Sequence, residues 1–88
     1  MNKNKEILTT LKKARSHLEK VIDMLEKEKY CIDILQQNLA VIGLLKSANG
    51  KLFKRHLNSC FASAMRGTNE RQKQKMIEEI LKINRLST

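Results

Sequence analysis

Apolar residues recur along the first third of the chain with the spacing of an amphipathic helix. Between about Lys5 and Lys27 they alternate steps of four and three residues, which is the heptad pattern of helices that pack against other helices. The positions of this stripe are Ile7, Leu11, Ala14, Leu18, Val21 and Leu25. Leu8 and Ile22 widen the stripe, which favours a helix within a bundle. We expect Glu28-Lys29-Tyr30 to connect it to the next helix.

A second helix is predicted from about Cys31 to Met65, and it is apolar on more than one side. Its apolar residues include Ile32, Ile34, Leu35, Leu39, Val41, Ile42, Leu44, Leu45, Leu52, Phe53, Leu57 and Phe61. A helix that is hydrophobic nearly all round is buried on several sides, so this segment should be the central helix of a bundle or an oligomer. Asp33 lies in its opening turn, where a negative charge suits the helix dipole.

A third, shorter helix follows a predicted turn at Arg66-Gly67-Thr68-Asn69. Its apolar residues are Met76, Ile77, Ile80, Leu81 and Ile83. No strand pattern competes with these helices, so the predicted fold is all-α, a three-helix protomer with a long central helix in a single domain spanning residues 1–88. A chain of 88 residues buries a limited core by itself, and we therefore expect an oligomer.

The balance of charge is strongly basic and unevenly distributed. The formal net charge is +9, with basic residues concentrated in residues 1–20 and 46–75, whereas residues 21–33 are net acidic. A field of this kind favours a polyanionic partner, most often nucleic acid. No apolar run approaches membrane-spanning length, and no apolar region of a secretion signal follows the polar N-terminus. The chain is therefore expected to act in the cytoplasm without a membrane.

Cys31, His56 and Cys60 carry the most specific chemistry of the chain. His56 and Cys60 lie four residues apart in a predicted helix, so their side chains should project from one face. Thiolate and imidazole are the donors that soft and borderline metal ions prefer. Two thiolates and one imidazole make a three-coordinate site that suits Cu(I). Zinc would need a fourth donor, for which His17 is a candidate.

The separation of Cys31 from His56 leaves two geometries open. If one unbroken helix joins them, the 25 intervening steps span roughly 37 Å, and Cys31 must come from another chain. A bend at Ala48-Asn49-Gly50 would instead fold the segment back and bring Cys31 to His56 and Cys60 within one chain, because Asn-Gly tolerates dihedral angles that a helix excludes.

The sequence offers little that an enzyme would need. It contains no Ser-His-Asp set, no paired carboxylates flanking a cleft and no phosphate-binding glycine loop, so we expect no enzymatic activity. A thiol-redox switch is an alternative to the metal site, because Cys31 and Cys60 could oxidise together.

Three segments of the chain carry a family resemblance. They are Tyr30-Cys31-Ile32-Asp33-Ile34-Leu35-Gln36-Gln37, Ala40-Val41 and His56-Leu57-Asn58-Ser59-Cys60. In these residues and their separations the chain resembles the CsoR/RcnR family of metal-sensing transcriptional repressors. The resemblance points to the copper-sensing branch, because the nickel and cobalt branch has a histidine at the position of Cys60, and the persulfide-sensing branch lacks the histidine.

The resemblance implies a function and a set of site residues. Cu(I) would bind Cys31 of one chain and His56 and Cys60 of its partner, and Glu78 or Glu79 would supply an outer hydrogen bond to these ligands. Tyr30 is a further candidate for such a bond, because its hydroxyl belongs to the residue next to Cys31. Family members form dimers of dimers that bind operator DNA and release it when metal binds. The residues that would face DNA are Lys12, Lys13, Arg15 and Lys46.

The expected function is therefore that of a Cu(I)-responsive repressor acting as a homodimer or homotetramer. One alternative is a thiol or persulfide sensor on the same scaffold. Another is a metal-binding helical protein without a DNA role. The segment Thr10–His17 departs from the arginine-containing motif that the family usually shows in its first helix.

Overall fold

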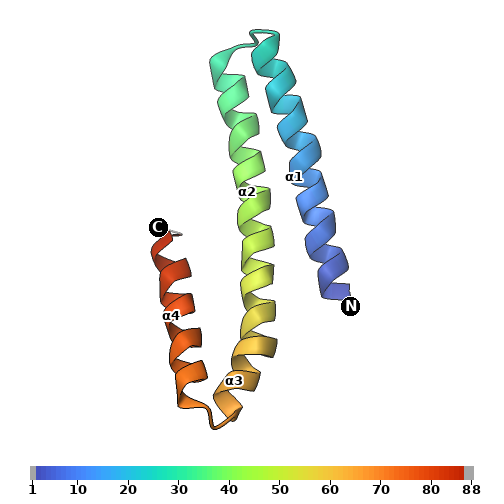
Figure 1. The fold of residues 1–88 in the computed structure, drawn as a ribbon. Helices are drawn as coiled ribbons and strands as arrows, with labels where there is room; N and C mark the ends of the chain where they lie inside the picture. Colours follow the sequence, from blue (N-terminus) through green and yellow to red (C-terminus); the bar gives the residue numbers. More distant parts are fainter. Residues whose placement is uncertain (1, 87–88) are drawn as a thin grey trace. The chain divides into compact units, whose positions relative to one another are not determined.

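Every regular element in the described part of the chain is helical. The computed structural model describes the backbone of residues 2–86 and the side chains of residues 4–86. Its elements are α1 (Asn2–Glu26), α2 (Cys31–His56), a π-helical turn η1 (Leu57–Phe61), α3 (Ala62–Arg66) and α4 (Glu70–Leu86) (Figure 1). Among the helices of residues 2–86, none is long and apolar enough to cross a membrane.

The predicted three-helix protomer with a long central helix is confirmed. The segments α2, η1 and α3 follow one another without a gap and form the central helical run. The chain divides into two compact units, Met1–Phe53 and Lys54–Thr88. The first is the hairpin of α1 and α2, and the second contains the end of the central run and α4. The single domain over residues 1–88 stays a prediction.

The seam between α1 and α2 is built from small apolar residues and a few polar ones. Its buried apolar side chains are Ile7, Ala14 and Val21 of α1 and Val41 and Ala48 of α2, each set spaced by seven residues. Polar groups between them are paired across the hairpin. His17 Nε2 lies 2.8 Å from Gln37 Oε1, and Lys51 Nζ lies 3.0 Å from a carboxylate oxygen of Glu6. The two helices are therefore held together both by close packing of small side chains and by specific polar pairs.

The predicted apolar stripe on α1 is right at three positions and wrong at three. Ile7, Ala14 and Val21 are buried, but Leu11, Leu18 and Leu25 are 38%, 43% and 67% exposed. The reason is that α1 meets α2 through the positions one residue earlier, which are Thr10, His17 and Met24. The three leucines consequently turn to another side of α1, together with Leu8 and Ile22.

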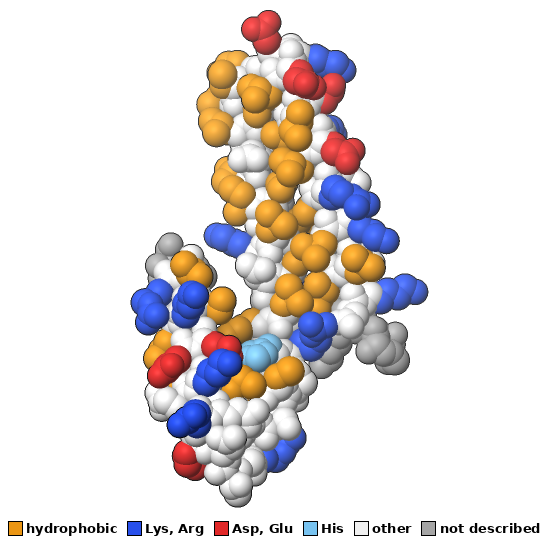
Figure 2. Space-filling model, in the orientation of Figure 1, with side chains coloured by type: hydrophobic (Ala, Val, Ile, Leu, Met, Phe, Trp, Pro, Cys, Tyr) orange, Lys and Arg blue, Asp and Glu red, His pale blue; other side chains and the backbone are white. Residues whose placement is uncertain are grey.

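The exposed apolar side chains of the hairpin form one continuous surface, which we call the apolar face. It comprises Leu8, Leu11, Leu18, Ile22 and Leu25 of α1 and Ile32, Leu35, Leu39, Ile42, Leu45 and Phe53 of α2. Figure 2 shows this face along both helices of the hairpin. The expected burial of α2 on several sides is not reached within one chain, where Val41 and Ala48 are the residues of α2 that are buried. An apolar surface of this extent indicates an interaction site.

A Schellman motif ends α1 at the predicted connection. The N–H of Lys29 donates to the carbonyl of Met24 and the N–H of Glu28 to that of Leu25, both at 3.0 Å. Glu28 has a φ of 53°, the left-handed conformation in which this motif usually has glycine. An L-residue in that region carries a steric penalty of roughly 1–2 kcal/mol.

Replacing Glu28 by glycine should therefore stabilise the hairpin. We expect the free energy of unfolding to rise by about 0.5–1 kcal/mol, because the greater freedom of glycine in the unfolded chain offsets part of the relieved strain. Urea denaturation followed by circular dichroism, at one fixed protein concentration, measures the change. Lys29→Gly is the matched control and should not stabilise, since Lys29 has no positive φ. Equal effects of both changes would contradict the explanation.

The second unit contains the other predicted turn and helix. The central run ends at Gly67, and Asn69 caps α4, since its Oδ1 accepts the N–H of Gln72 at 3.0 Å. The predicted turn at residues 66–69 and the third helix are both confirmed. Met76 and Ile80 of α4 are half-buried, whereas Ile77 and Leu81 are exposed.

Candidate functional site

His56 and Cys60 lie where the central run changes its helical type. His56 is the last residue of α2, and Cys60 lies within the π-helical turn η1. The N–H of Ala62 donates to the carbonyl of Leu57, five residues earlier, which defines the wider turn. Four residues make slightly more than one turn of an α-helix and slightly less than one turn of a π-helix, so the two side chains still leave on one side. π-turns inside helices are frequent at functional sites.

The hydroxyl of Ser59 links the backbone of this turn to the cysteine. Ser59 Oγ donates to the carbonyl of Arg55 at 2.6 Å and lies 3.9 Å from Cys60 Sγ. A serine that bonds back to the carbonyl four residues earlier often bends a helix. Cys60 is exposed with a free thiol, and His56 is half-buried, so both donor atoms are available to an incoming ion.

Cys31 lies at the other end of the same helix. It is the first residue of α2, and its thiol is free and exposed. Residues 48–50 are helical, so the bend that would return Cys31 to His56 is not formed. The helical rise over the 26 residues of α2 separates Cys31 from His56 by roughly 37 Å. Within the residues that the structure describes, no three His, Cys, Asp or Glu side chains form a group that could hold a metal ion.

The residues expected around the ligands lie on several elements. Tyr30 precedes α2, accepts the N–H of Ile34 with its carbonyl at 3.2 Å, and exposes its side chain. Glu78 and Glu79 are on α4 in the second unit, where Glu78 Oε1 accepts from Gln74 Nε2 at 3.4 Å. His17, the candidate fourth donor for zinc, is held by its hydrogen bond to Gln37 within the hairpin.

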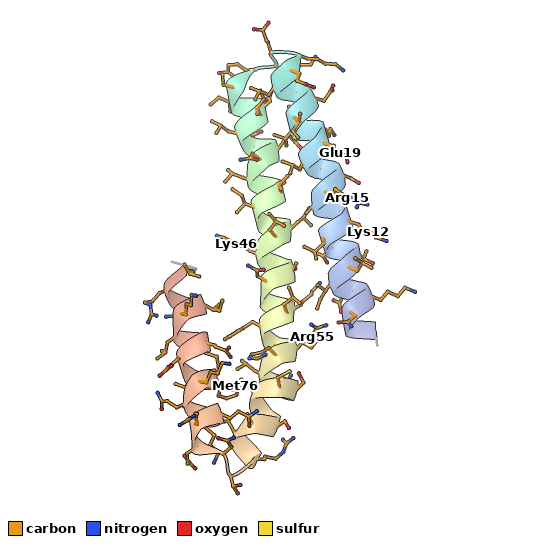
Figure 3. All side chains as sticks on the ribbon, viewed as in Figure 1. Lys12, Arg15, Glu19, Lys46, Arg55 and Met76 are labelled. Atoms are coloured by element: carbon orange, nitrogen blue, oxygen red, sulfur yellow. The ribbon has the colours of Figure 1, made fainter. Side chains whose placement is uncertain are left out.

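The basic residues expected to meet DNA lie on more than one side of the hairpin. Lys12 and Arg15 leave α1 on its outer side, and Lys46 leaves α2 on the opposite side of the hairpin (Figure 3). Lys12 and Lys13 line a groove of about 600 Å³ along α1, whereas Arg15 and Lys46 are not among its lining residues. Lys12 therefore shares a side of α1 with Arg15 and lines the groove with Lys13, whereas Lys46 lies apart from the other three.

The sequence prediction did not include three further polar residues of this groove. Thr9 lies one turn before Lys13, and Ser16 and Lys20 lie one turn and two turns beyond it. These residues could have been predicted from their spacing. Residues 9, 13, 16 and 20 place hydroxyl and ammonium groups alternately on one side of a helix. The apolar heptad positions of α1 do not include this polar row.

Comparison with known proteins gives relatives of one kind. The family model described as "Metal-sensitive transcriptional repressor" matches residues 3–85. The copper-sensing transcriptional repressor CsoR of Mycobacterium ulcerans is 41% identical over 64 residues, which are 73% of this chain and 55% of that protein. CsoR of Bacillus subtilis is 30% identical over 78 residues, or 89% of this chain and 74% of that protein.

A solved structure shows the same similarity in three dimensions. The crystal structure of the copper-sensing repressor CsoR with Cu(I) from Geobacillus thermodenitrificans NG80-2 superimposes with a TM-score of 0.82 and 30% identity, covering 96% of this chain and 85% of that chain. The chain spans about half the length of the mycobacterial relatives that it matches. From the family match over residues 3–85 and from these similarities, the chain belongs to the CsoR family of metal-sensitive transcriptional repressors.

Proposed function

We propose that the chain is a Cu(I)-responsive repressor whose metal site is shared between two copies. Cys31 of one copy and His56 and Cys60 of another would bind one Cu(I). The observation that carries this proposal is the uninterrupted α2 helix, because it keeps Cys31 and His56 at opposite ends of one element. Each copy then offers two incomplete half-sites, and a two-fold pair completes both.

The donor set supports Cu(I) as the ion. Thiolates are soft ligands that select Cu(I), and two of them with one imidazole satisfy a three-coordinate ion. A structural zinc site would take four ligands. The candidate fourth donor, His17, lies on α1 and is hydrogen-bonded through Nε2 to Gln37. The relatives from Mycobacterium ulcerans and Bacillus subtilis are copper-sensing repressors, which agrees with this choice.

The apolar face supports a homo-oligomer, either a dimer or a dimer of dimers. Large side chains such as Leu39 at 64% exposure and Leu35 at 56% have nothing to cover them within one chain. A second copy of the hairpin would bury them, and the same pairing would bring the ends of two α2 helices together. The oligomer and the shared metal site are therefore two aspects of one proposal.

The basic charge supports operator DNA as the second ligand, bound in the cytoplasm. The chain carries a net charge of +9, and Lys12 and Lys13 lie side by side in one groove. Charge of this sign strengthens binding to phosphates and makes it dependent on salt. Cu(I) would favour a conformation of the oligomer with lower DNA affinity, a coupling that is typically about 1–3 kcal/mol, or about 5–150-fold. Arg15 and Lys46 remain further candidates for DNA contacts.

Anisotropy titration of a labelled fragment from upstream of the gene tests the proposal. The metal-free protein should bind the fragment more tightly at low than at high salt. One equivalent of Cu(I) per chain should then weaken binding by about 5–150-fold. His56→Ala is the control, and it should bind DNA like the original chain but respond far less to Cu(I). Failure to bind DNA at low salt, or binding that Cu(I) leaves unchanged, would favour a metal-binding protein without a DNA role.

A thiol or persulfide sensor is the second candidate, because Cys31 and Cys60 are both exposed with free thiols. Exposed thiols are open to oxidation and persulfidation. This alternative requires both cysteines but not His56. The His56→Ala chain therefore separates the two functions, since a thiol sensor would still release DNA after treatment with a persulfide donor.

A further inference from the structure

Two basic side chains, Lys54 and Arg55, come immediately before His56 on the central run. Both are exposed. Figure 3 shows Arg55 on the lower part of α2, near the end of that helix. Residues 34–69 contain no Asp or Glu, so this whole stretch of the central run offers no carboxylate of its own to balance them. The run is therefore positively charged where it carries His56 and Cys60.

The charges of Lys54 and Arg55 are not neutralised by an ion pair. No ion pair within residues 4–86 includes either residue. Basic residues in the last turn of a helix usually complement the helix dipole. That explanation does not account for them here, because the helical run continues beyond α2 through η1 and α3. The two charges are therefore available to act on the neighbouring donor atoms.

The backbone of Arg55 is fixed close to the cysteine by a serine. Ser59 Oγ donates to the carbonyl of Arg55 at 2.6 Å and lies 3.9 Å from Cys60 Sγ. The ends of side chains on adjacent turns of one helix are separated by roughly 10–14 Å. This separation is comparable with the Debye length of about 10 Å at 0.1 M salt, so salt weakens the interaction of these charges with a bound ion without abolishing it.

The charge of the loaded site depends on the ion. Two thiolates and a neutral imidazole give a complex of net charge −1 with Cu(I) and of zero charge with a divalent ion such as Zn(II). The Cu(I) complex is one unit more negative whatever protons the free thiols carry. A fixed positive charge nearby therefore stabilises the Cu(I) complex relative to the Zn(II) complex. Carboxylates elsewhere around the site do not change the sign of this effect.

We propose that Lys54 and Arg55 are specificity-determining residues, which favour Cu(I) over divalent ions at the site of Cys31, His56 and Cys60. The proposal rests on the proposed shared metal site and adds a second source of selectivity to it. Thiolate donors select an ion by its softness. The two fixed charges select it by its charge, and they act through the electric field without binding the metal.

The relative affinity for Cu(I) and Zn(II) tests this role. Replacing both residues, Lys54→Glu with Arg55→Glu, changes the local charge by four units. The ratio of the Cu(I) to the Zn(II) association constant should fall by about three- to tenfold at 0.1 M salt. The fall should shrink to less than about 1.5-fold at 1 M salt, where the Debye length is about 3 Å. A chromophoric Cu(I) chelator and a fluorescent Zn(II) chelator measure the two constants under anaerobic conditions, without DNA.

Two sets of variants distinguish charge from structure. Exchanging the two residues, Lys54→Arg with Arg55→Lys, keeps both charges while it changes both side chains, and it should keep the original ratio. Lys46→Glu is the matched control for Arg55→Glu alone, because it reverses one charge about 15 Å along α2 from His56. Arg55→Glu should lower the ratio about twofold at 0.1 M salt, and Lys46→Glu should leave it unchanged.

Circular dichroism and sedimentation velocity on the same samples report folding and oligomeric state. If the double Glu variant misfolds or dissociates, Lys54→Gln with Arg55→Gln decides the matter. It removes two units of charge without adding a carboxylate, and it should lower the ratio about twofold at 0.1 M salt.

The outcomes separate this inference from the proposed function. If the original chain binds Cu(I) but the charge variants change both affinities equally, or lower the ratio equally at 1 M salt, the electrostatic role is overturned and the shared metal site stands. The same conclusion follows if Lys46→Glu lowers the ratio as much as Arg55→Glu. If the original chain binds no Cu(I), both the specificity role and the proposed function are overturned.

Discussion

Mixing Cys31→Ala chains with Cys60→Ala chains should restore Cu(I) sites that neither variant has alone. In a mixed two-fold pair, one site has lost both thiolates, and the other keeps Cys31 of one chain with His56 and Cys60 of its partner. After equal amounts are unfolded and refolded together, about a quarter of the original number of sites should return, since about half of the pairs are mixed and each has one intact site. A chromophoric Cu(I) chelator under anaerobic conditions measures the number of sites.

Each variant refolded alone is the control and should hold no high-affinity Cu(I). Tyr30→Phe gives a second comparison. It removes only a hydroxyl next to Cys31, so it should weaken Cu(I) by at most about 10–100-fold and keep the number of sites. If the mixture binds no better than its parents, the shared site is wrong. X-ray absorption that detects only nitrogen and oxygen neighbours would also exclude the proposed ligands.

A negative charge on the apolar face should dissociate the oligomer. Leu39 is 64% exposed in the single chain, and burying a leucine side chain is worth about 1.5–3 kcal/mol. Leu39→Glu removes that gain and would bury a charge, and a two-fold interface contains the substitution twice. We expect the association constant to fall by more than about 10³-fold, which sedimentation velocity detects as a shift to the monomer.

Ala40→Glu is the matched control for this experiment. It adds the same charge one residue along α2, about 100° around the helix and outside the apolar face. Its oligomeric state should stay that of the original chain. If Leu39→Glu sediments like Ala40→Glu, the apolar face is not the interface between copies.

The melting temperature of the original chain should also rise with protein concentration, because association stabilises the folded state.

The helices themselves could be predicted from sequence because local signals mark them. The turn at Glu28-Lys29-Tyr30, the turn before α4 and the all-α architecture agree with the structure. The side of α1 that meets α2 could not be predicted, because two sets of positions combine with the buried apolar row of that helix. Ile7, Ala14 and Val21 are common to both. The apolar pattern predicts a contact through the leucines at positions 11, 18 and 25, whereas the structure uses the polar Thr10 and His17.

The sequence singles out candidate ligands, whose role stays a prediction, but it does not predict their local geometry. Cys31, His56 and Cys60 stand out by their chemistry, and the family of repressors to which the chain belongs agrees with the expectation that it is not an enzyme. The bend at Ala48-Asn49-Gly50 was open at the sequence level, because Asn and Gly disfavour a helix only weakly. The neighbouring helical turns keep those residues in α2. No sequence rule indicates the π-turn around Cys60, which contains the hydrogen bond from Ser59 to Arg55.

The length of α2 also bears on how steeply such a protein would respond to copper. One helix carries Cys31 at its start and His56 at its end, so in the proposed two-fold pair both sites would lie on the same two helices. The first ion would align these helices at one end and thereby remove much of the orientational freedom that the second ion would otherwise have to restrict. The second ion would then bind to a pair that is already ordered. Loading would be cooperative, and a repressor of this design would change state over a narrower range of copper concentration than two independent sites allow.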